Sequence, residues 1–232
     1  RRQRQMCIRD RASAMQLFGN PSCINTAKIL QTAGEKGVDV EVHKINSGEE
    51  AAEMSPLHSA PVLKDLDNIV YGPNAIISYL DDKGFGPSLI PRNGVIRAIM
   101  YQYAHIASDY VQMEAYGMLT GSGGNMDTIN KAFDVLEKIL TNPTDPKLKR
   151  DVYICGEFSL ADIHWMACVN ALEISGNSDV VSSRAKVSEW CAAVKAHPAT
   201  SKEDIVPFTC LPTKEDVDSG TLRNVAINVL EG

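Results

Sequence analysis

Several features that define large protein classes are missing from this chain of 232 residues. No apolar run approaches the ~20 residues that a membrane-spanning helix needs, so we expect no membrane span. The formal net charge is -6, with 23 lysines and arginines against 29 acidic residues, which argues against a nucleic-acid-binding surface. No internal repeat or low-complexity block is visible. The hydrophobic content of 44% is ample for one large domain or two small ones.

The six cysteines lack the spacing of a metal or dithiol site. They are Cys7, Cys23, Cys155, Cys168, Cys191 and Cys210. No two of them form a CxxC pair, and none has the spacing of zinc ligands, so we expect no metal site. Cysteines scattered in this way suggest a reducing compartment.

The first third of the chain alternates between strand and helix patterns. The predicted elements are a strand at Met15–Phe18, a helix from Cys23 or Ile24 to a glycine stop at Gly34–Gly37, a half-buried strand over 38–43, a hairpin of Val62–Lys64 and Ile69–Tyr71, and a helix at Pro73–Asp82. The stretch Gly84–Pro91, rich in glycine and proline, reads as a linker.

The rest of the chain is predicted to be helical. The expected helices are Gly94–Met118, Met126–Leu140, one that starts at Ser159, and Ala185–Ala196. At the third of these, Ser159 and Asp162 have the spacing of a capping box. Beyond Ile205, the residues Val225 and Val229 fit a strand or a helix equally well, and both alternatives stay open.

Cys23 and Pro61 have the sequence contexts of functional residues. Cys23 follows a strand and stands where a helix begins, and the partial positive charge of a helix N-terminus favours a thiolate. The pair Ala60-Pro61 precedes the hairpin, and a proline at such a tight turn can be cis. Together, these positions suggest thiol chemistry, and we expect the Cys23 thiol to lie within reach of solvent, beside Ala60.

This order of elements resembles the glutathione S-transferase superfamily. The strand–helix–strand unit with Cys23 and Pro61 looks like its thioredoxin-like N-terminal domain. The segment GEFSLADIHWMACVNAL, followed by Trp190 and by His197-Pro198-Ala199, looks like signatures of its helical C-terminal domain. The resemblance implies an α+β thioredoxin-like domain at 14–83, a linker at 84–92 and an all-α bundle at 93–204. The residues 1–13 and 205–232 would be extensions.

The resemblance also implies positions for a glutathione site. Cys23 falls on the catalytic hydroxyl position, with Ser22 as the alternative. A cysteine there resembles the cysteine-type classes, because a thiolate attacks the sulfur of a mixed disulfide, whereas serine can only hydrogen-bond a thiolate. Ala60, before the expected cis Pro61, would pair its backbone with the cysteinyl part of glutathione. Lys44 would contact the glycyl carboxylate, although a solvated strand end is the favoured explanation of its position.

The chain departs from the family where the γ-glutamyl end of glutathione binds. The family has an acid and a serine there, and this chain has Gly72 and Pro73, followed by Asn74. Glycine has no carboxylate, and proline has neither a hydroxyl nor an N–H. Losing two or three hydrogen bonds to charged groups would weaken binding by roughly 3–6 kcal/mol, or about a hundred- to ten-thousand-fold. Asn74, Asp65 or a partner subunit could compensate.

Other side chains are expected to have structural roles. Tyr101, Tyr103, Tyr110, Met113 and Tyr116 would form core or a dimer interface more readily than the substrate pocket that the resemblance implies. His164 is expected to be a packed core histidine.

Two functions follow from this pattern. One is a glutathione-transferase-like protein with a degraded glutathione site, weakly active or non-catalytic, that serves in a homodimer or a larger protein complex. The alternative is an active cysteine-type glutathione transferase, acting in thiol transfer or on small electrophiles, with glutathione as co-substrate. The basic start RRQRQMCIRDRAS is either an organelle transit-peptide remnant or a solvated arm, which places the protein in the cytoplasm or in an organelle stroma.

Overall fold

A four-stranded mixed sheet forms one side of the molecule. The computed structural model describes residues 14–20, 23–45, 54–56, 58–142 and 152–197. The strands are β1 (Met15–Phe18), β2 (Val40–His43), β3 (Val62–Asp65) and β4 (Asn68–Tyr71), in the order β2-β1-β3-β4. β1 pairs in parallel with β2 and antiparallel with β3, and β3 pairs antiparallel with β4. This arrangement confirms the thioredoxin-like sheet.

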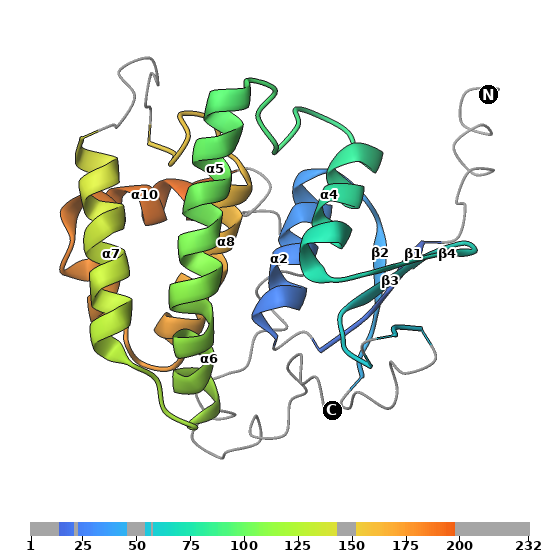
Figure 1. Ribbon diagram of the computed structural model, residues 1–232, viewed down its shortest axis with the longest axis horizontal. Coiled ribbons are helices and arrows are strands. Elements are labelled where there is room, and N and C mark those ends of the chain that lie inside the picture. Colours follow the sequence, from blue (N-terminus) through green and yellow to red (C-terminus); the bar gives the residue numbers. More distant parts are fainter. Residues whose placement is uncertain (1–13, 21–22, 46–53, 57, 143–151, 198–232) are drawn as a thin grey trace.

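Two helices separate the sheet from the rest of the molecule. α2 (Ile24–Glu35) and α4 (Pro73–Lys83) lie between the sheet and the helical domain (Figure 1). Every residue of α2 from Ile24 to Ala33 is buried, because the sheet lies on one side of the helix and the helical domain on the other. Pro73 occupies the first turn of α4, where its missing N–H has no intrahelical partner to lose.

The helical domain confirms the predicted all-α bundle and adds one irregular turn. Its elements are α5 (Gly94–Ile106), η1 (Ala107–Val111), α6 (Gln112–Thr120), α7 (Met126–Thr141), α8 (Leu160–Ile174), α9 (Asp179–Ser182) and α10 (Ala185–Ala196). The expected single helix Gly94–Met118 is wrong in detail, because the five residues of η1 form a π-helical turn within it. In the described part of this half, β pairing is confined to isolated bridges near Tyr153–Glu157.

The predicted capping box at the start of α8 is confirmed. The Asp162 carboxylate accepts hydrogen bonds from the backbone N–H and the hydroxyl of Ser159, at 2.9 Å and 3.0 Å. Its other oxygen accepts from the Ile154 N–H at 3.0 Å and from Trp190 Nε1 at 2.9 Å. One buried carboxylate therefore connects the segment before α8, the helix itself and α10.

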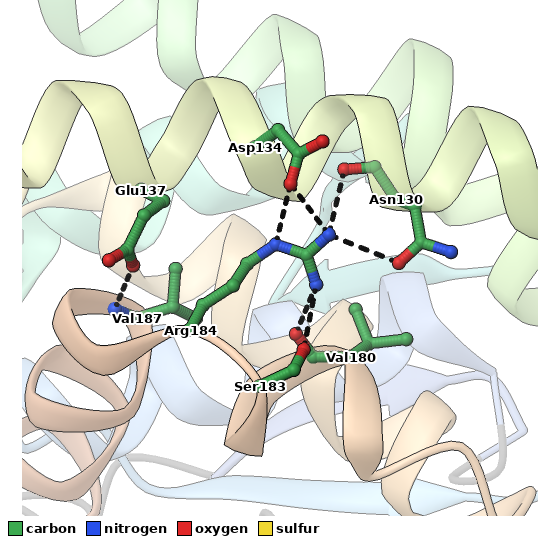
Figure 2. Close-up of polar contacts among 7 residues, drawn as sticks. All are labelled: Asn130, Asp134, Glu137, Val180, Ser183, Arg184 and Val187. Carbon is green, nitrogen blue, oxygen red and sulfur yellow. Dashed lines mark hydrogen bonds and ion pairs between the residues drawn. The ribbon is translucent and has the colours of Figure 1, made fainter.

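Arg184 connects α7 to the segment between α9 and α10 (Figure 2). Its guanidinium donates to Asp134 Oδ1 at 2.9 Å and 2.7 Å, to both oxygens of Asn130, and to the Val180 carbonyl at 2.6 Å. Beside it, Glu137 accepts from two backbone N–H groups at the start of α10. These contacts are structural, because they saturate the guanidinium with protein acceptors.

A buried ion pair connects α2, α4 and the segment after α4. Lys36 Nζ lies 3.1 Å from Asp81 Oδ1, and both side chains are almost completely buried. Lys36 also donates to the Pro87 carbonyl at 2.8 Å, and Asp81 accepts from the Leu89 N–H and the Ser88 hydroxyl. The predicted linker 84–92 is thus anchored to the first domain. The predicted extensions 1–13 and 205–232 lie outside the described residues.

Candidate functional site

Cys23 lies at the start of α2, as the sequence predicts. It is the N-cap residue, in extended conformation at φ -81 and ψ 130. Its N–H donates to the Asn20 carbonyl at 2.9 Å, and its own carbonyl accepts from the Ala27 N–H at 3.0 Å. The turn after β1 therefore places the thiol against the first-turn N–H groups of α2. The alternative residue, Ser22, lies outside the described residues.

The expectation that Cys23 is within reach of solvent is wrong. Cys23 is only 5% exposed. Burial raises the pKa of the thiol, and this effect outweighs the hydrogen bonds from Thr26 and Asn25 and the charge of Lys28, which lower it. Gln112 of α6 donates from Nε2 to Asn25 Oδ1 at 3.0 Å, so the helical domain packs against the first turn of α2. A thiol in this setting is mostly protonated at neutral pH.

The cis proline lies where the resemblance places it. The Ala60-Pro61 bond is cis, and Pro61 is buried directly before β3. Gly19, after β1, shows how closely the segments approach: a Cβ there would lie 2.9 Å from Thr26 Oγ1 and 3.3 Å from Pro61 Cβ. The end of β1, the first turn of α2 and the cis proline therefore meet at one point.

The backbone at the expected γ-glutamyl anchor is unsuited to an acid. Gly72 is the N-cap of α4 with φ 86 and ψ 124, a conformation that residues with a Cβ rarely adopt. Pro73 follows at the first helical position and supplies no N–H. Neither of these two residues can itself supply a carboxylate or a hydroxyl.

The proposed compensating residues differ in their surroundings. Asp65 accepts a hydrogen bond from the Tyr79 hydroxyl at 2.6 Å and lies 3.6 Å from Lys83 Nζ, so it has protein partners already. Asn74 is exposed in the first turn of α4. Lys44 is exposed directly after β2, which leaves both the solvated-end and the ligand interpretations open.

Sequence reasoning missed a polar cluster between the two domains. Lys28 of α2 is 1% exposed, and its Nζ lies 3.2 Å from Ser108 Oγ and 3.2 Å from His164 Nδ1. The ammonium also donates to Gln112 Oε1, and Gln112 Nε2 donates to Asn25 Oδ1 at 3.0 Å. The signal in the sequence is a lysine between the apolar residues Ala27 and Ile29 of the predicted helix, and that context does not reveal its partners.

His164 is a buried histidine, as expected, but it belongs to this polar cluster. Burial, and then the charge of Lys28, hold the pKa of its imidazole well below the usual value, so the ring is neutral. Burial likewise lowers the pKa of Lys28.

The aromatic set on the long helix divides into two groups. Tyr103 and Tyr116 are buried in the core. Tyr101, Tyr110 and Met113 are each more than half exposed. The exposed group is compatible with either an interface or a pocket wall.

The described residues lack the features of a membrane protein of the helical type and of a metal centre. Within the described ranges, no helix is both long and apolar enough to cross a membrane. The same residues contain no cluster of three or more histidine, cysteine or acidic side chains that could hold a metal ion.

Comparison with known proteins identifies the family. Residues 17–88 match the glutathione S-transferase N-terminal domain, and residues 124–202 match the glutathione S-transferase C-terminal domain. The chain belongs to the glutathione S-transferase superfamily.

Curated relatives and solved structures agree with this assignment. Glutathione S-transferase F14 of Arabidopsis thaliana is 29% identical over 210 residues, which are 80% of this chain and 79% of that protein. A glutathione S-transferase of Hyoscyamus muticus is 27% identical over 81% of this chain and 96% of that protein. A glutathione transferase of Bombyx mori has the same fold, with a TM-score of 0.72 at 22% identity, over 89% of this chain and 97% of that one.

Proposed function

We propose that this chain is a glutathione S-transferase family protein with a weakened glutathione site, weakly active or non-catalytic, that serves as a subunit of a homodimer or a larger assembly. The observation that carries the proposal is Gly72-Pro73 at the start of α4, with Gly72 at φ 86. Gly72 has no carboxylate, and Pro73 has neither a hydroxyl nor a backbone N–H. The charged γ-glutamyl end of glutathione therefore has no partner on these two residues. The buried, protonated Cys23 supports the same conclusion.

The second candidate is an active cysteine-type transferase. It is favoured by the position of Cys23 at the N-cap of α2, where hydrogen bonds from Thr26 and Asn25 lower the pKa of the thiol. The two curated relatives from Arabidopsis thaliana and Hyoscyamus muticus carry glutathione S-transferase names, and one related solved structure, from Methylobacillus flagellatus, contains bound glutathione. In this candidate, glutathione would be the co-substrate and Cys23 the nucleophile.

Calorimetric titration of glutathione into the purified full-length chain separates the two candidates. We expect no saturable binding in the micromolar range. The rescue variant is Pro73→Ser, which returns one N–H and one hydroxyl. It should tighten glutathione binding by roughly 10- to 100-fold, since each hydrogen bond to a charged group contributes about 1.5–3 kcal/mol.

Two variants complete the titration. Pro91→Ser, in the segment after α4, is the matched control and should leave binding unchanged. Gly72→Glu is a poor rescue, because the backbone at φ 86 adds about 1–3 kcal/mol of strain to any residue with a Cβ. Micromolar glutathione binding by the unmodified chain would refute the weakened-site proposal.

The ionisation of Cys23 provides an independent measurement. Because burial raises the pKa of this thiol, we expect alkylation of Cys23 at pH 7 to be no faster than that of the other cysteines, and to rise only in alkaline solution. Mass spectrometry of the labelled peptides resolves each cysteine. Selective labelling of Cys23 near pH 7 would favour the cysteine-type transferase.

The subunit role is tested at the predicted extensions. We propose the segments 1–11 and 206–230 as the first places to look for contacts with a partner. Light scattering of the full chain and of a chain lacking both segments compares their assembly states. Identical assembly in both would show that these segments are not the docking elements.

A further inference from the structure

Ser108 joins the polar cluster around Lys28 to a cavity between the two domains. The cavity has a volume of about 320 Å³ and is lined by α4, the α5–η1 helix and α8. Ser108 lies in the π-helical turn η1, lines the cavity and is only partly buried, whereas Lys28 is not among the lining residues. Single π-helical turns occur often at functional sites. The Ser108 hydroxyl therefore meets the cavity on one side and the cluster on the other.

Two nitrogen bases lie within hydrogen-bond distance of this hydroxyl. His164 Nδ1 lies 2.9 Å from Ser108 Oγ, and Lys28 Nζ lies 3.2 Å from it. Burial, and then the charge of Lys28, hold the pKa of His164 well below its usual value, so the imidazole is a poor proton acceptor. Burial also lowers the pKa of Lys28, and interactions with two buried cysteines and with Asp109 offset only part of this effect. An unperturbed lysine has a pKa about 4 above that of histidine, so Lys28 is the stronger base.

The other contacts of Lys28 leave the lone pair of its neutral amine for Ser108. Gln112 Nε2 donates to Asn25 Oδ1 at 3.0 Å, so Gln112 Oε1 is the atom that accepts from Lys28. His164 Nδ1 lies 3.2 Å from Nζ and is a second acceptor when the ring carries its proton on Nε2. A neutral amine has two N–H donors and one lone pair. Because the two acceptors take both donors, the lone pair can accept the proton of the Ser108 hydroxyl.

The protonated form of Lys28 is accommodated as well. Its ammonium has three N–H donors, and Gln112, His164 and Ser108 offer three acceptors. The exposed carboxylate of Asp109 interacts with Lys28 and favours the charged form. The cluster thus holds Lys28 in both protonation states, as a general base requires.

We propose that Ser108 is a nucleophile with which this chain cleaves small uncharged carboxylic esters, and that Lys28 is its general base. Ser108 Oγ attacks the carbonyl carbon of the ester as its proton passes to Lys28, and a bond forms between Oγ and the acyl group. The bond to the alcohol oxygen breaks, and Lys28 returns the proton to the leaving alkoxide. Water then attacks the acyl group on Ser108, with Lys28 as base again. This step releases the carboxylic acid and restores the hydroxyl, and only ester and water are consumed.

The walls of the cavity define the class of ester. Side chains of α4, of the segment after it and of α8 are apolar and suit a small apolar acyl or alcohol group; they are Ile77, Ile90 and Leu160. Asp109 lines the same cavity, so an ester that carries a carboxylate is disfavoured. Asn74 also lines it, and its amide can donate to the oxyanion of the tetrahedral intermediate.

The proposed cleavage does not rest on the proposed function. It uses neither glutathione nor the Cys23 thiol. Asn74 follows Gly72-Pro73 directly, so bound glutathione would overlap this cavity. The reaction must therefore be measured without glutathione.

The test is hydrolysis of p-nitrophenyl acetate by the full-length chain in the absence of glutathione. We expect release of p-nitrophenol above the uncatalysed rate. Mass spectrometry of the digested protein should find an acetyl group on the peptide that contains Ser108. The acylation rate should rise with pH as Lys28 loses its proton. It should level off below pH ~10.4, where an ordinary lysine would do so, because burial lowers the pKa of Lys28.

Three variants assign the reaction to this cluster. Ser108→Ala should reduce the rate to the uncatalysed one. Lys28→Met keeps a long buried side chain and should slow acylation about a hundred- to ten-thousand-fold, the range that a positioned general base contributes. Ser78→Ala, at another serine that lines the cavity, is the matched control and should leave the rate unchanged. Fluorescence of the buried Trp165 and Trp190 checks that each variant folds, and Ser108→Ala with the pH profile carries the test if Lys28→Met does not fold.

Three outcomes would overturn the proposal. The first is acetylation of surface lysines or of Cys23 alone, with the Ser108 peptide unmodified. The second is a Ser108→Ala variant that is slowed no more than Ser78→Ala. The third is turnover that appears only when glutathione is added, because the ester is then cleaved by the glutathione thiol. That third result would favour the active transferase, whereas glutathione binding without such turnover bears on the proposed function alone.

Discussion

Replacement of Asp162 by asparagine should destabilise the helical domain more than any single capping change. The carboxylate is completely buried and accepts four hydrogen bonds, from two donors of Ser159, from the Ile154 N–H and from Trp190. Asparagine keeps one accepting oxygen and replaces the other with an NH₂ group, which can only donate. Two of the four donors therefore lose their acceptor.

The structure indicates which donors are lost. The Ser159 hydroxyl can rotate to accept from the new NH₂ group, so the amide nitrogen should face Ser159 and the amide oxygen should face Ile154 and Trp190. The Ser159 N–H then remains buried without its partner, at about 1–3 kcal/mol, and the other bonds lose their charged acceptor. The sum is a loss of about 3 kcal/mol in the free energy of unfolding.

Urea denaturation measures this loss. The chain has two tryptophans, Trp165 and Trp190, and both are completely buried in the helical domain, so their fluorescence reports its unfolding. Ser159→Ala is the matched control, because it removes one hydroxyl and leaves the carboxylate with three donors. It should lose about 1 kcal/mol. An Asp162→Asn variant as stable as Ser159→Ala would refute the reasoning, because the charge and the fourth bond would then contribute nothing.

Two further predictions concern the ion pairs. Burial alone would raise the pKa of Asp81, but hydrogen bonds from Leu89 and Ser88 and the charge of Lys36 outweigh it and hold the pKa below its usual value. The stability that this carboxylate contributes should be present above pH ~4 and lost as the pH falls through the lowered folded-state pKa. The melting temperatures of wild type and Asp81→Asn should therefore converge in acid. A difference that stays constant with pH would contradict this. Arg184→Lys should lower the free energy of unfolding, measured by urea denaturation, by about 1–2 kcal/mol. Most of this loss comes from the contacts to backbone carbonyls and to Asn130, because the Asp134 side chain is largely exposed. An unchanged urea midpoint would show that the forked donors of the guanidinium do not contribute to stability.

Local patterns carried the prediction of the fold. The alternation of valine with polar residues over 38–43 predicted β2, and the Ser159–Asp162 spacing predicted the start of α8. The cis bond at Pro61 followed from the resemblance and its place before the hairpin. These features depend on neighbours in the sequence, which is why the sequence alone revealed them.

The features that were missed depend on tertiary packing. The apolar period of 3.6 residues continues through η1, so no pattern marks the π-helical turn. Cys23 has the sequence context of a reactive thiol, but the packing of the two domains buries it. Lys28 acquires its partners from residues that lie 80 to 136 positions away in the chain. Such contacts appear only when both domains are assembled.

The complete burial of α2 has a consequence for how this chain can be divided. One face of the helix completes the sheet domain, and the other carries Lys28 into the helical domain. An isolated first domain would expose that apolar face together with a lysine stripped of its acceptors. An isolated second domain would lose the ammonium that organises Ser108 and His164. We therefore expect the two halves to unfold as one cooperative unit, because α2 belongs to the core of both.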